Sequence, residues 1–318
     1  MLTAEHLRDL RIDPRLHPRG QPHLSAASGL VRAGQRLYVV ADDEHHLGVF
    51  DDMALTGTTT QVTTAPGSLL RLLDGDLPLK PGQRKKAKPD LESLALLPAL
   101  PGCPHGALLA LGSGSRPNRE TGVLMALDGQ GAANGRIARV DLGVLYAPLR
   151  AQFTDLNIEG AFVASGELHL LHRGNRGDAR NACIRYDWNQ VAPWLTGQRT
   201  RAPVAKGVQL IRLGEAGGVP LGLTDGAALS CGAWVFTAVA EDTADSFSDG
   251  ACVGSAVGIV GPEGQVRQLQ ALHGAPKVEG VAVQADSHQL VLTLVTDPDN
   301  PAVASQLLQV RWAPGEPG

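Results

Sequence analysis

The chain has 318 residues, of which 43% are hydrophobic and 19% charged, as in an ordinary folded globular protein and unlike a disordered one. Its formal net charge of −4 excludes the strongly basic surface that nucleic-acid binding requires. No apolar run approaches the ~18 residues of a membrane span, so we expect neither nucleic acid nor a membrane as partner. A polar N-terminus without signal-peptide character and four widely separated cysteines favour a cytoplasmic protein with reduced thiols.

One short phrase recurs five times along the chain. It consists of a carboxylate or hydroxyl residue, a small residue, and an aliphatic residue that begins a β-like run. Successive copies lie 54 to 67 residues apart, and a repeat of several short strands is typical of a β-propeller. The copies are Ser28-Gly29-Leu30, Glu92-Ser93-Leu94, Glu159-Gly160-Ala161, Asp225-Gly226-Ala227 and Glu279-Gly280-Val281.

Each phrase is followed by short β-favouring runs that Gly or Asp turns separate. Four runs follow each of the first four phrases, the fourth run of the first unit being the Thr-rich stretch 56–64. Only three runs follow the last phrase, and segment 5–12, ahead of the first phrase, is available as the missing outer strand. We therefore predict an all-β fold in which residues 1–318 form a single β-propeller domain of five four-stranded blades, with the N-terminal segment closing the last blade. A six-bladed ring with one blade hidden in insertions is the alternative.

Two insertions interrupt the repeat, at residues 68–90 and 191–205. The first contains the only basic run, Arg84-Lys85-Lys86 with Lys88, which we interpret as a solvated loop. The second contains the segment 191–195, for which we expect one helical turn.

The first residue of each phrase is predicted to point into the central channel, because the first strand of a blade lies innermost. The small second residue would let neighbouring inner strands approach closely. Several carboxylates meeting at one axis repel each other and lose hydration, and a divalent cation removes that conflict. Calcium, which accepts six to eight oxygen ligands in adaptable geometry, suits such a ring better than magnesium. The predicted ligands are Ser28, Glu92, Glu159, Asp225 and Glu279. The alternative is a water-filled channel whose carboxylates are protonated or paired with Lys or Arg.

This set of residues resembles the axial ring of the calcium-activated nucleotidase (apyrase) five-bladed propellers. The phrases around Glu159 and Glu279 also look like the acid-glycine-aliphatic repeat of bacterial phytase-like or esterase-like propeller proteins. The resemblance implies calcium on the axial residues, with substrate phosphates above it. Asp225 departs from the pattern, since it supplies an acid where a neutral hydroxyl would suit that ring.

The loops after the second strands are expected to surround one mouth of the channel, where propellers commonly bind ligands. Arg116, Arg119 and Arg173 lie in two neighbouring loops, and their guanidinium groups suit a phosphate or carboxylate. His172 directly follows a second strand and is the candidate general base, although a hydrogen-bonded wall residue is the simpler interpretation.

Two functions follow from these expectations. The first is a metal-dependent hydrolase of an anionic small molecule, with a phosphate ester as the expected substrate, acting as a monomer. The second is a non-catalytic propeller that binds a ligand or a protein and uses the ion structurally. Lactonase or esterase chemistry is a third and weaker option.

Overall fold

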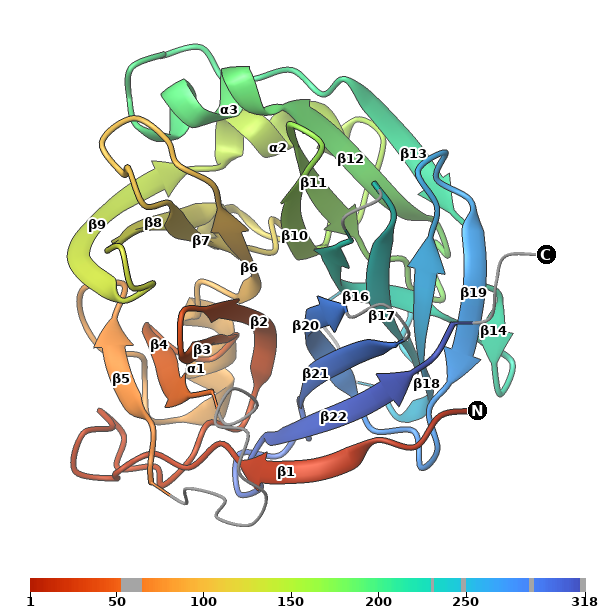
Figure 1. Cartoon of the computed structure of the whole chain (residues 1–318). Coiled ribbons are helices and arrows are strands. Elements are labelled where there is room, and N and C mark those ends of the chain that lie inside the picture. Colours follow the sequence, from red (N-terminus) through yellow and green to blue (C-terminus); the bar gives the residue numbers. More distant parts are fainter. Residues whose placement is uncertain (53–64, 230–231, 247–249, 286–288, 315–318) are drawn as a thin grey trace.

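The structure, a computed structural model, describes residues 1–52, 65–229, 232–246, 250–285 and 289–314. Within these ranges the chain forms five four-stranded antiparallel sheets that surround a central axis (Figure 1). The prediction of a mostly β, five-bladed propeller with four-stranded blades is confirmed, and the six-bladed alternative is excluded.

In every blade the strands run from the axis outward in an up-and-down order, except that the last blade takes its outermost strand from the N-terminus. The strands of the first two blades are β2 (Ala27–Ala33), β3 (Arg36–Ala41), β4 (His46–Asp51) and β5 (Ser68–Arg71), then β6 (Leu91–Leu97), β7 (Ala107–Gly112), β8 (Thr121–Leu127) and β9 (Ala133–Asp141). Those of the third and fourth are β10 (Ile158–Ala164), β11 (Glu167–His172), β12 (Asn181–Asp187) and β13 (Gly207–Ile211), then β16 (Gly222–Ala228), β17 (Trp234–Glu241), β18 (Cys252–Val260) and β19 (Val266–Ala271). The fifth blade contains β20 (Val278–Ala285), β21 (Leu290–Thr296), β22 (Gln306–Trp312) and β1 (Glu5–Asp9).

The ring is closed by the pairing of the two ends of the chain. Strand β1 runs antiparallel to β22, with Glu5 opposite Gln309 and Asp9 opposite Gln306. Figure 1 shows β1 on the outer side of β22, the last strand of the chain. Because β1 covers the edge of β22, the fifth sheet reaches four strands like the others.

Two details of the first blade differ from the sequence-based expectation. The Thr-rich stretch 56–64 lies outside the described residues, and the fourth strand is β5, which begins at Ser68 inside the segment taken as an insertion. The basic run, expected to be a solvated loop, forms helix α1 (Pro81–Ala87). Arg84 and Lys88 are only 8% exposed, because both reach carboxylates of the central channel.

The remaining short elements lie mainly on the outside of the ring. Helix α2 (Gly143–Arg150) links the second and third blades, and α3 (Trp188–Leu195) follows β12 at the expected helical turn. The 3-10 helix η2 spans Pro117–Arg119, and a hairpin of β14 (Glu215–Ala216) and β15 (Val219–Pro220) precedes the fourth blade. Among the described residues, no helix is long and apolar enough to cross a membrane.

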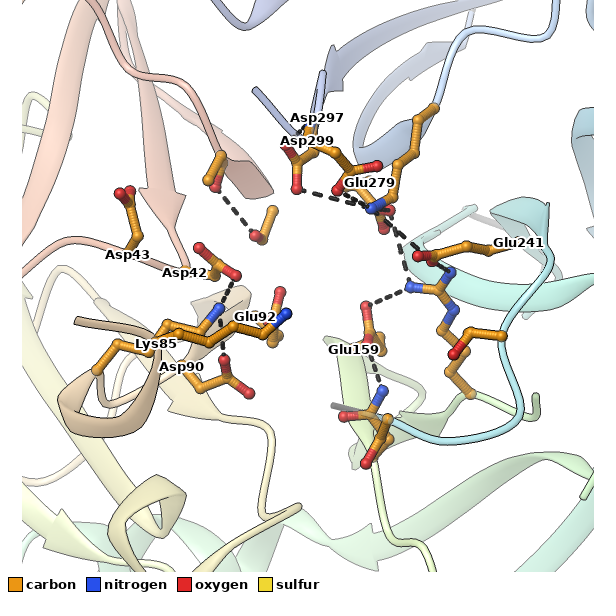
Figure 2. A pocket seen from close by; sticks show the side chains of 18 of the residues that line it. Asp42, Asp43, Lys85, Asp90, Glu92, Glu159, Glu241, Glu279, Asp297 and Asp299 are labelled. Atoms are coloured by element: carbon orange, nitrogen blue, oxygen red, sulfur yellow. Dashed lines mark hydrogen bonds and ion pairs between the residues drawn. The ribbon is translucent and has the colours of Figure 1, made fainter. Parts of the chain in front are cut away.

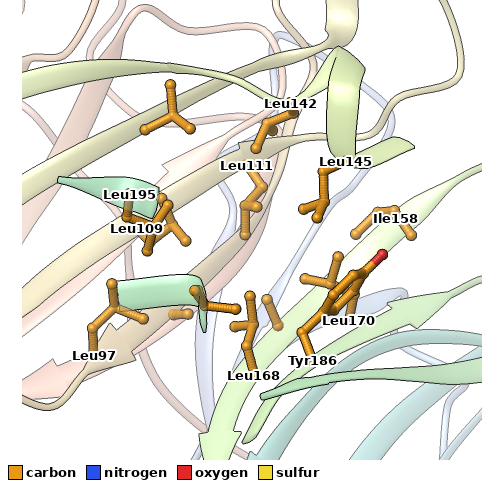
Figure 3. Packing of buried hydrophobic residues seen from close by; sticks show 14 of the residues in the cluster. Leu97, Leu109, Leu111, Leu142, Leu145, Ile158, Leu168, Leu170, Tyr186 and Leu195 are labelled. Carbon is orange, nitrogen blue, oxygen red and sulfur yellow. The ribbon is translucent and has the colours of Figure 1, made fainter. Parts of the chain in front are cut away.

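The hydrophobic core is divided into sectors between blades rather than gathered in one centre. In the described residues, five clusters of buried apolar side chains each join two neighbouring blades. The largest lies between the second and third blades, where Leu109 and Leu111 of β7 meet Leu168 and Leu170 of β11 (Figure 3). Helices α2 and α3 cover this cluster, with Leu145 and Leu195 buried in it. These apolar clusters between neighbouring blades hold the blades at a fixed angle to each other, and polar residues occupy the central axis.

Small residues at the second position of the phrases permit the inner strands to approach closely, as expected. A Cβ atom on Gly29 would lie 2.7 Å from the backbone nitrogen of Leu94 in the next blade. A Cβ on Gly160 would lie 2.8 Å from the Cα of Asp225, and one on Gly280 would lie 2.9 Å from the nitrogen of Leu30. Neighbouring backbones therefore leave no room for a side chain at these positions.

Candidate functional site

The polar residues at the axis owe their direction to a β-bulge at the start of each inner strand. Strand register shifts by one residue at Ser28 in β2, Glu92 in β6, Glu159 in β10 and Glu279 in β20. An extra residue at a bulge has no partner across the sheet, and its side chain is turned away from the regular alternation. The four predicted ligands are thus structurally equivalent and occupy the same level of the propeller.

The fourth blade carries the same bulge one residue earlier than the sequence phrase indicates. The shift falls at Thr224, while Asp225 pairs with Thr237 as Gly29 pairs with Val40. Thr224 is therefore the counterpart of Ser28, and a neutral hydroxyl stands at the position where Asp225 had looked out of place. The hydroxyl of Thr224 donates to the carbonyl oxygen of Val278 at 2.8 Å and is fully buried.

Asp225 differs from the other four predicted ligands, because both of its carboxylate oxygens accept backbone hydrogen bonds. Its Oδ1 accepts the backbone N–H of Gly226 at 2.7 Å, and its Oδ2 accepts that of Val281 in the fifth blade at 2.9 Å. Burial raises the pKa of this carboxyl, while backbone hydrogen bonds, including those from Leu30 and Ala161, oppose the shift. Asp225 thus ties inner strands together, and its role as a metal ligand stays a prediction.

A cavity of about 210 Å³ lies at the mouth of the channel and is lined by residues of all five blades. Ten carboxylate side chains face six Lys and Arg side chains in its wall. In Figure 2, Glu92, Glu159 and Glu279 face one central space, with acidic loop residues around them. If all these groups were ionised, the wall would carry an excess of negative charge, which favours a cationic occupant.

Three carboxylates approach each other on one side of the cavity. Oxygens of Asp42, Asp90 and Glu92 all lie within 4.8 Å of one another. Asp90 accepts hydrogen bonds from Ser113 Oγ and Arg119 Nη1, both at 2.6 Å, which fixes its orientation. These acids form a hard oxygen donor set of the kind that binds calcium, magnesium or manganese. We call these three residues the acidic triad.

The ammonium group of Lys88 lies against the acidic triad. Its Nζ atom contacts Asp42 and lies 2.8 Å from Asp90 Oδ1. The pKa of Glu92 is raised well above its usual range, first by burial and then by the neighbouring Asp90 and Glu159 carboxylates. Burial likewise raises the pKa of Asp42. When the three carboxylates are ionised, their negative charge exceeds the positive charge of Lys88 and Arg119. The acidic triad can therefore accept an additional cation.

The opposite side of the cavity is organised by Arg173. Its guanidinium lies 2.6 Å from Glu241 Oε2, 3.3 Å from Glu159 Oε2 and 3.7 Å from Glu279 Oε1. Coulombic attraction to Arg173 and Lys277 holds the pKa of Glu241 below its usual value, against the effect of burial. The pKa of Glu279 is raised well above its usual range because burial outweighs the same two cations. These two neighbouring acids therefore ionise differently.

The residues predicted to bind substrate are dispersed. Arg119 and Arg173 line the cavity, but both are engaged with its carboxylates. Arg116 caps η2 and lies outside the cavity wall formed by the described residues. His172 is also outside that wall: it is 2% exposed, accepts the N–H of Asn157 through Nδ1 at 3.1 Å, and packs on the ring of Phe153. Their assigned roles in binding and catalysis stay predictions.

Sequence reasoning missed Asp42 and Asp90 as members of the site. A signal for Asp90 was present, because side chains two residues apart in an extended chain lie on the same side. Lys88, Asp90 and Glu92 have this spacing in the sequence and all line the cavity, although in the structure Asp90 has a φ of 56° and Glu92 lies at the bulge. Asp42 belongs to a loop that was recognised as part of the mouth, but its contact with Asp90 depends on how two blades pack.

The chain was compared with known proteins at the level of families and of folds. A model described as a family of unknown function, DUF6929, matches residues 23–312. The catalytic domain of the GH62 α-L-arabinofuranosidase of Coprinopsis cinerea is similar in structure, with a TM-score of 0.50, 11% identity, and coverage of 98% of this chain and 97% of that one. The α-L-arabinofuranosidase PaAbf62A of Podospora anserina gives 0.49 and 9%, with 98% of each chain covered. A luciferin-regenerating enzyme gives 0.44 and 9%, with 92% and 93% covered.

The likeness to the Coprinopsis cinerea domain shows a shared fold and carries no activity, since the sequence identity is only 11%. No protein with a curated description matches the sequence. Of the expected resemblance, the β-propeller fold is thus supported. The relationship to calcium-activated nucleotidases and phytase-like proteins stays a prediction.

Proposed function

The chain belongs to the DUF6929 family, and because membership brings no known activity, we propose from its geometry that it is a ligand-binding β-propeller with a divalent-cation site in its central cavity. The observation that carries the proposal is the convergence of Asp42, Asp90 and Glu92 within 4.8 Å. Calcium is the proposed ion, because carboxylates with a variable number of waters match its adaptable coordination.

Lys88 determines how the ion enters the site. Its ammonium contacts both Asp42 and Asp90, so a divalent cation on the acidic triad displaces it. A lysine side chain has a flexible four-carbon stem and can move away from the carboxylates. Lys88 thus acts as a counter-ion that reduces the repulsion between the triad carboxylates when no metal is bound. For the same reason it lowers the apparent affinity of the triad for metal.

Titration calorimetry with calcium on protein stripped by a chelator tests this proposal. We expect one ion per chain, with binding lost or weakened at least about tenfold in Asp42→Asn and Glu92→Gln. Lys88→Met removes the competing ammonium and is expected to bind calcium about tenfold more tightly. Glu263→Gln is the matched control, because Glu263 is 70% exposed and lies outside the cavity wall. Failure of calcium, magnesium, manganese and zinc to bind, or unchanged binding in Glu92→Gln, would refute the site.

The metal-dependent hydrolase of a phosphate ester is the second candidate. It is favoured by Glu159 and Arg173, which line the same cavity across from the acidic triad, so that a substrate between them and the ion could be polarised. It is less well supported than binding alone, because the arginines expected to hold an anion are paired with carboxylates. Metal-dependent turnover on a panel of phosphate esters and lactones, lost in Glu159→Gln, would establish it.

A further inference from the structure

Five of the Lys and Arg side chains in the cavity wall are matched with carboxylates of the same wall. Arg84 pairs with Asp43 at 3.2 Å, and Lys277 pairs with Asp299 at 2.5 Å. As described above, Lys88, Arg119 and Arg173 likewise contact carboxylates that line the cavity. Because these positive groups neutralise acids inside the wall, they leave little attraction for an anionic ligand.

Glu279 is the exception among the acids. It is 4% exposed, lines the cavity, and neither of its carboxylate oxygens has a hydrogen-bond partner. The nearest cationic atoms, Arg173 Nη1 and Lys277 Nζ, both lie 3.7 Å from Oε1, beyond hydrogen-bonding distance. A buried carboxylate with both oxygens unsatisfied is costly to the folded protein, so its retention points to a ligand that satisfies it.

We infer that the cavity binds a small organic cation, a guanidinium or primary ammonium compound, whose N–H groups hydrogen-bond both carboxylate oxygens of Glu279. This inference rests on the proposed ligand-binding function and names its ligand class. A guanidinium group presents two parallel N–H donors that match two carboxylate oxygens. Glu279 is not part of the acidic triad, whose oxygens converge as a metal ion requires, so the two sites accept different kinds of cation.

The ligand has room beside Glu279 because the cavity volume is about 210 Å³. Asp297 and Asp299 line the same part of the wall and add carboxyl oxygens around the ligand. Ser28 also lines the cavity, and its hydroxyl is available to accept a further N–H. The surroundings of Glu279 therefore supply further hydrogen-bond acceptors to a compact cation.

The test is calorimetric titration of the chelator-treated full chain with butylguanidinium, butylammonium and, as a neutral control of similar size, butanol. Inorganic phosphate serves as the anionic control. We expect the guanidinium and ammonium compounds to bind one per chain, and butanol and phosphate not to bind. In Glu279→Gln, affinity for the cations should fall at least about tenfold, because a charge-assisted pair is lost. Glu263→Gln should bind them as the unchanged protein does.

Thermal unfolding of Glu279→Gln separates loss of binding from loss of fold. Since the substitution replaces a buried carboxyl group whose oxygens have no hydrogen-bond partner, we expect the free variant to melt at the same or a higher temperature. Butylguanidinium should raise the melting temperature of the unchanged protein but not that of the variant. Absence of binding by both cations, preferential binding of phosphate, or equal affinity in Glu279→Gln would overturn the inference.

The calcium titrations distinguish failure of the organic-cation site at Glu279 from failure of the metal site at the acidic triad. Glu92→Gln should lose calcium and still bind butylguanidinium, whereas Glu279→Gln should lose butylguanidinium and still bind calcium. Loss of calcium binding in Glu279→Gln, with no effect of the organic cation, would instead assign Glu279 to the metal.

Discussion

At the scale of single residues, the partners of a buried polar group, rather than its residue type, decide what the group does. Glu241 and Glu279 are both buried glutamates beside Arg173, but only Glu241 also receives a close guanidinium and the N–H of Gly250 at 2.8 Å. Their pKa values are accordingly displaced in opposite directions. Asp225 shows the same dependence, because backbone donors make it a link between strands.

His172 gives a pH dependence of stability that can be measured. Burial lowers its pKa to about 4, whereas an unfolded histidine titrates near about 6.5. Between these values the unfolded state binds more protons, so the free energy of unfolding falls as the pH drops from about 6.5 to about 4. The contribution of one such histidine is about 3 kcal/mol when complete.

Urea unfolding of the unchanged protein and His172→Gln across pH 4 to 8 measures this contribution. The difference between the two curves should change with pH in that window, since glutamine does not titrate. His6→Gln is the control, because the His6 side chain is 50% exposed. A difference that is independent of pH would show that His172 is not neutral and buried in solution.

At the scale of elements, four of the inner strands (β2, β6, β10 and β20) combine a bulge that turns one side chain toward the cavity with a small residue that lets backbones meet. The two features account for the first two residues of the phrase. They also explain the displaced phrase in β16, where Thr224 occupies the bulge and Asp225 occupies the position held elsewhere by Gly or Ser.

Gly160→Ala tests the close approach of β10 and β16. The new Cβ would lie 2.8 Å from the Cα of Asp225 and 3.0 Å from Leu171 Cδ1, so the backbone has to shift. We expect the free energy of unfolding to fall by about 1–3 kcal/mol, the usual effect of overpacking. Gly82→Ala in α1 is the control, because nothing lies within 4 Å of its added Cβ. Equal stability of the two variants in urea unfolding would contradict the packing described here.

At the scale of the whole molecule, closure by β1 couples the two ends of the chain. Removing residues 1–9 uncovers the edge of β22, which then has unpaired backbone groups. We expect the truncated protein to melt at a lower temperature and to aggregate at concentrations where the full chain does not. A synthetic peptide of residues 1–12 should restore the melting temperature in part. Unchanged melting after truncation would show that β1 contributes nothing to closure.

The five-fold repeat, the strand order and the small residues at the axis could be predicted from the amino-acid sequence, because they depend on local alternation and on a period that repeats along the chain. The sequence also placed Ser28, Glu92, Glu159 and Glu279 at equivalent positions. Only the tertiary structure revealed the strand register at Thr224, the burial of Lys88 and Arg84, and the proximity of the Asp42 and Asp90 carboxylates. Each of these depends on one-residue bulges or on the packing of neighbouring blades, which leave no periodic trace in the sequence.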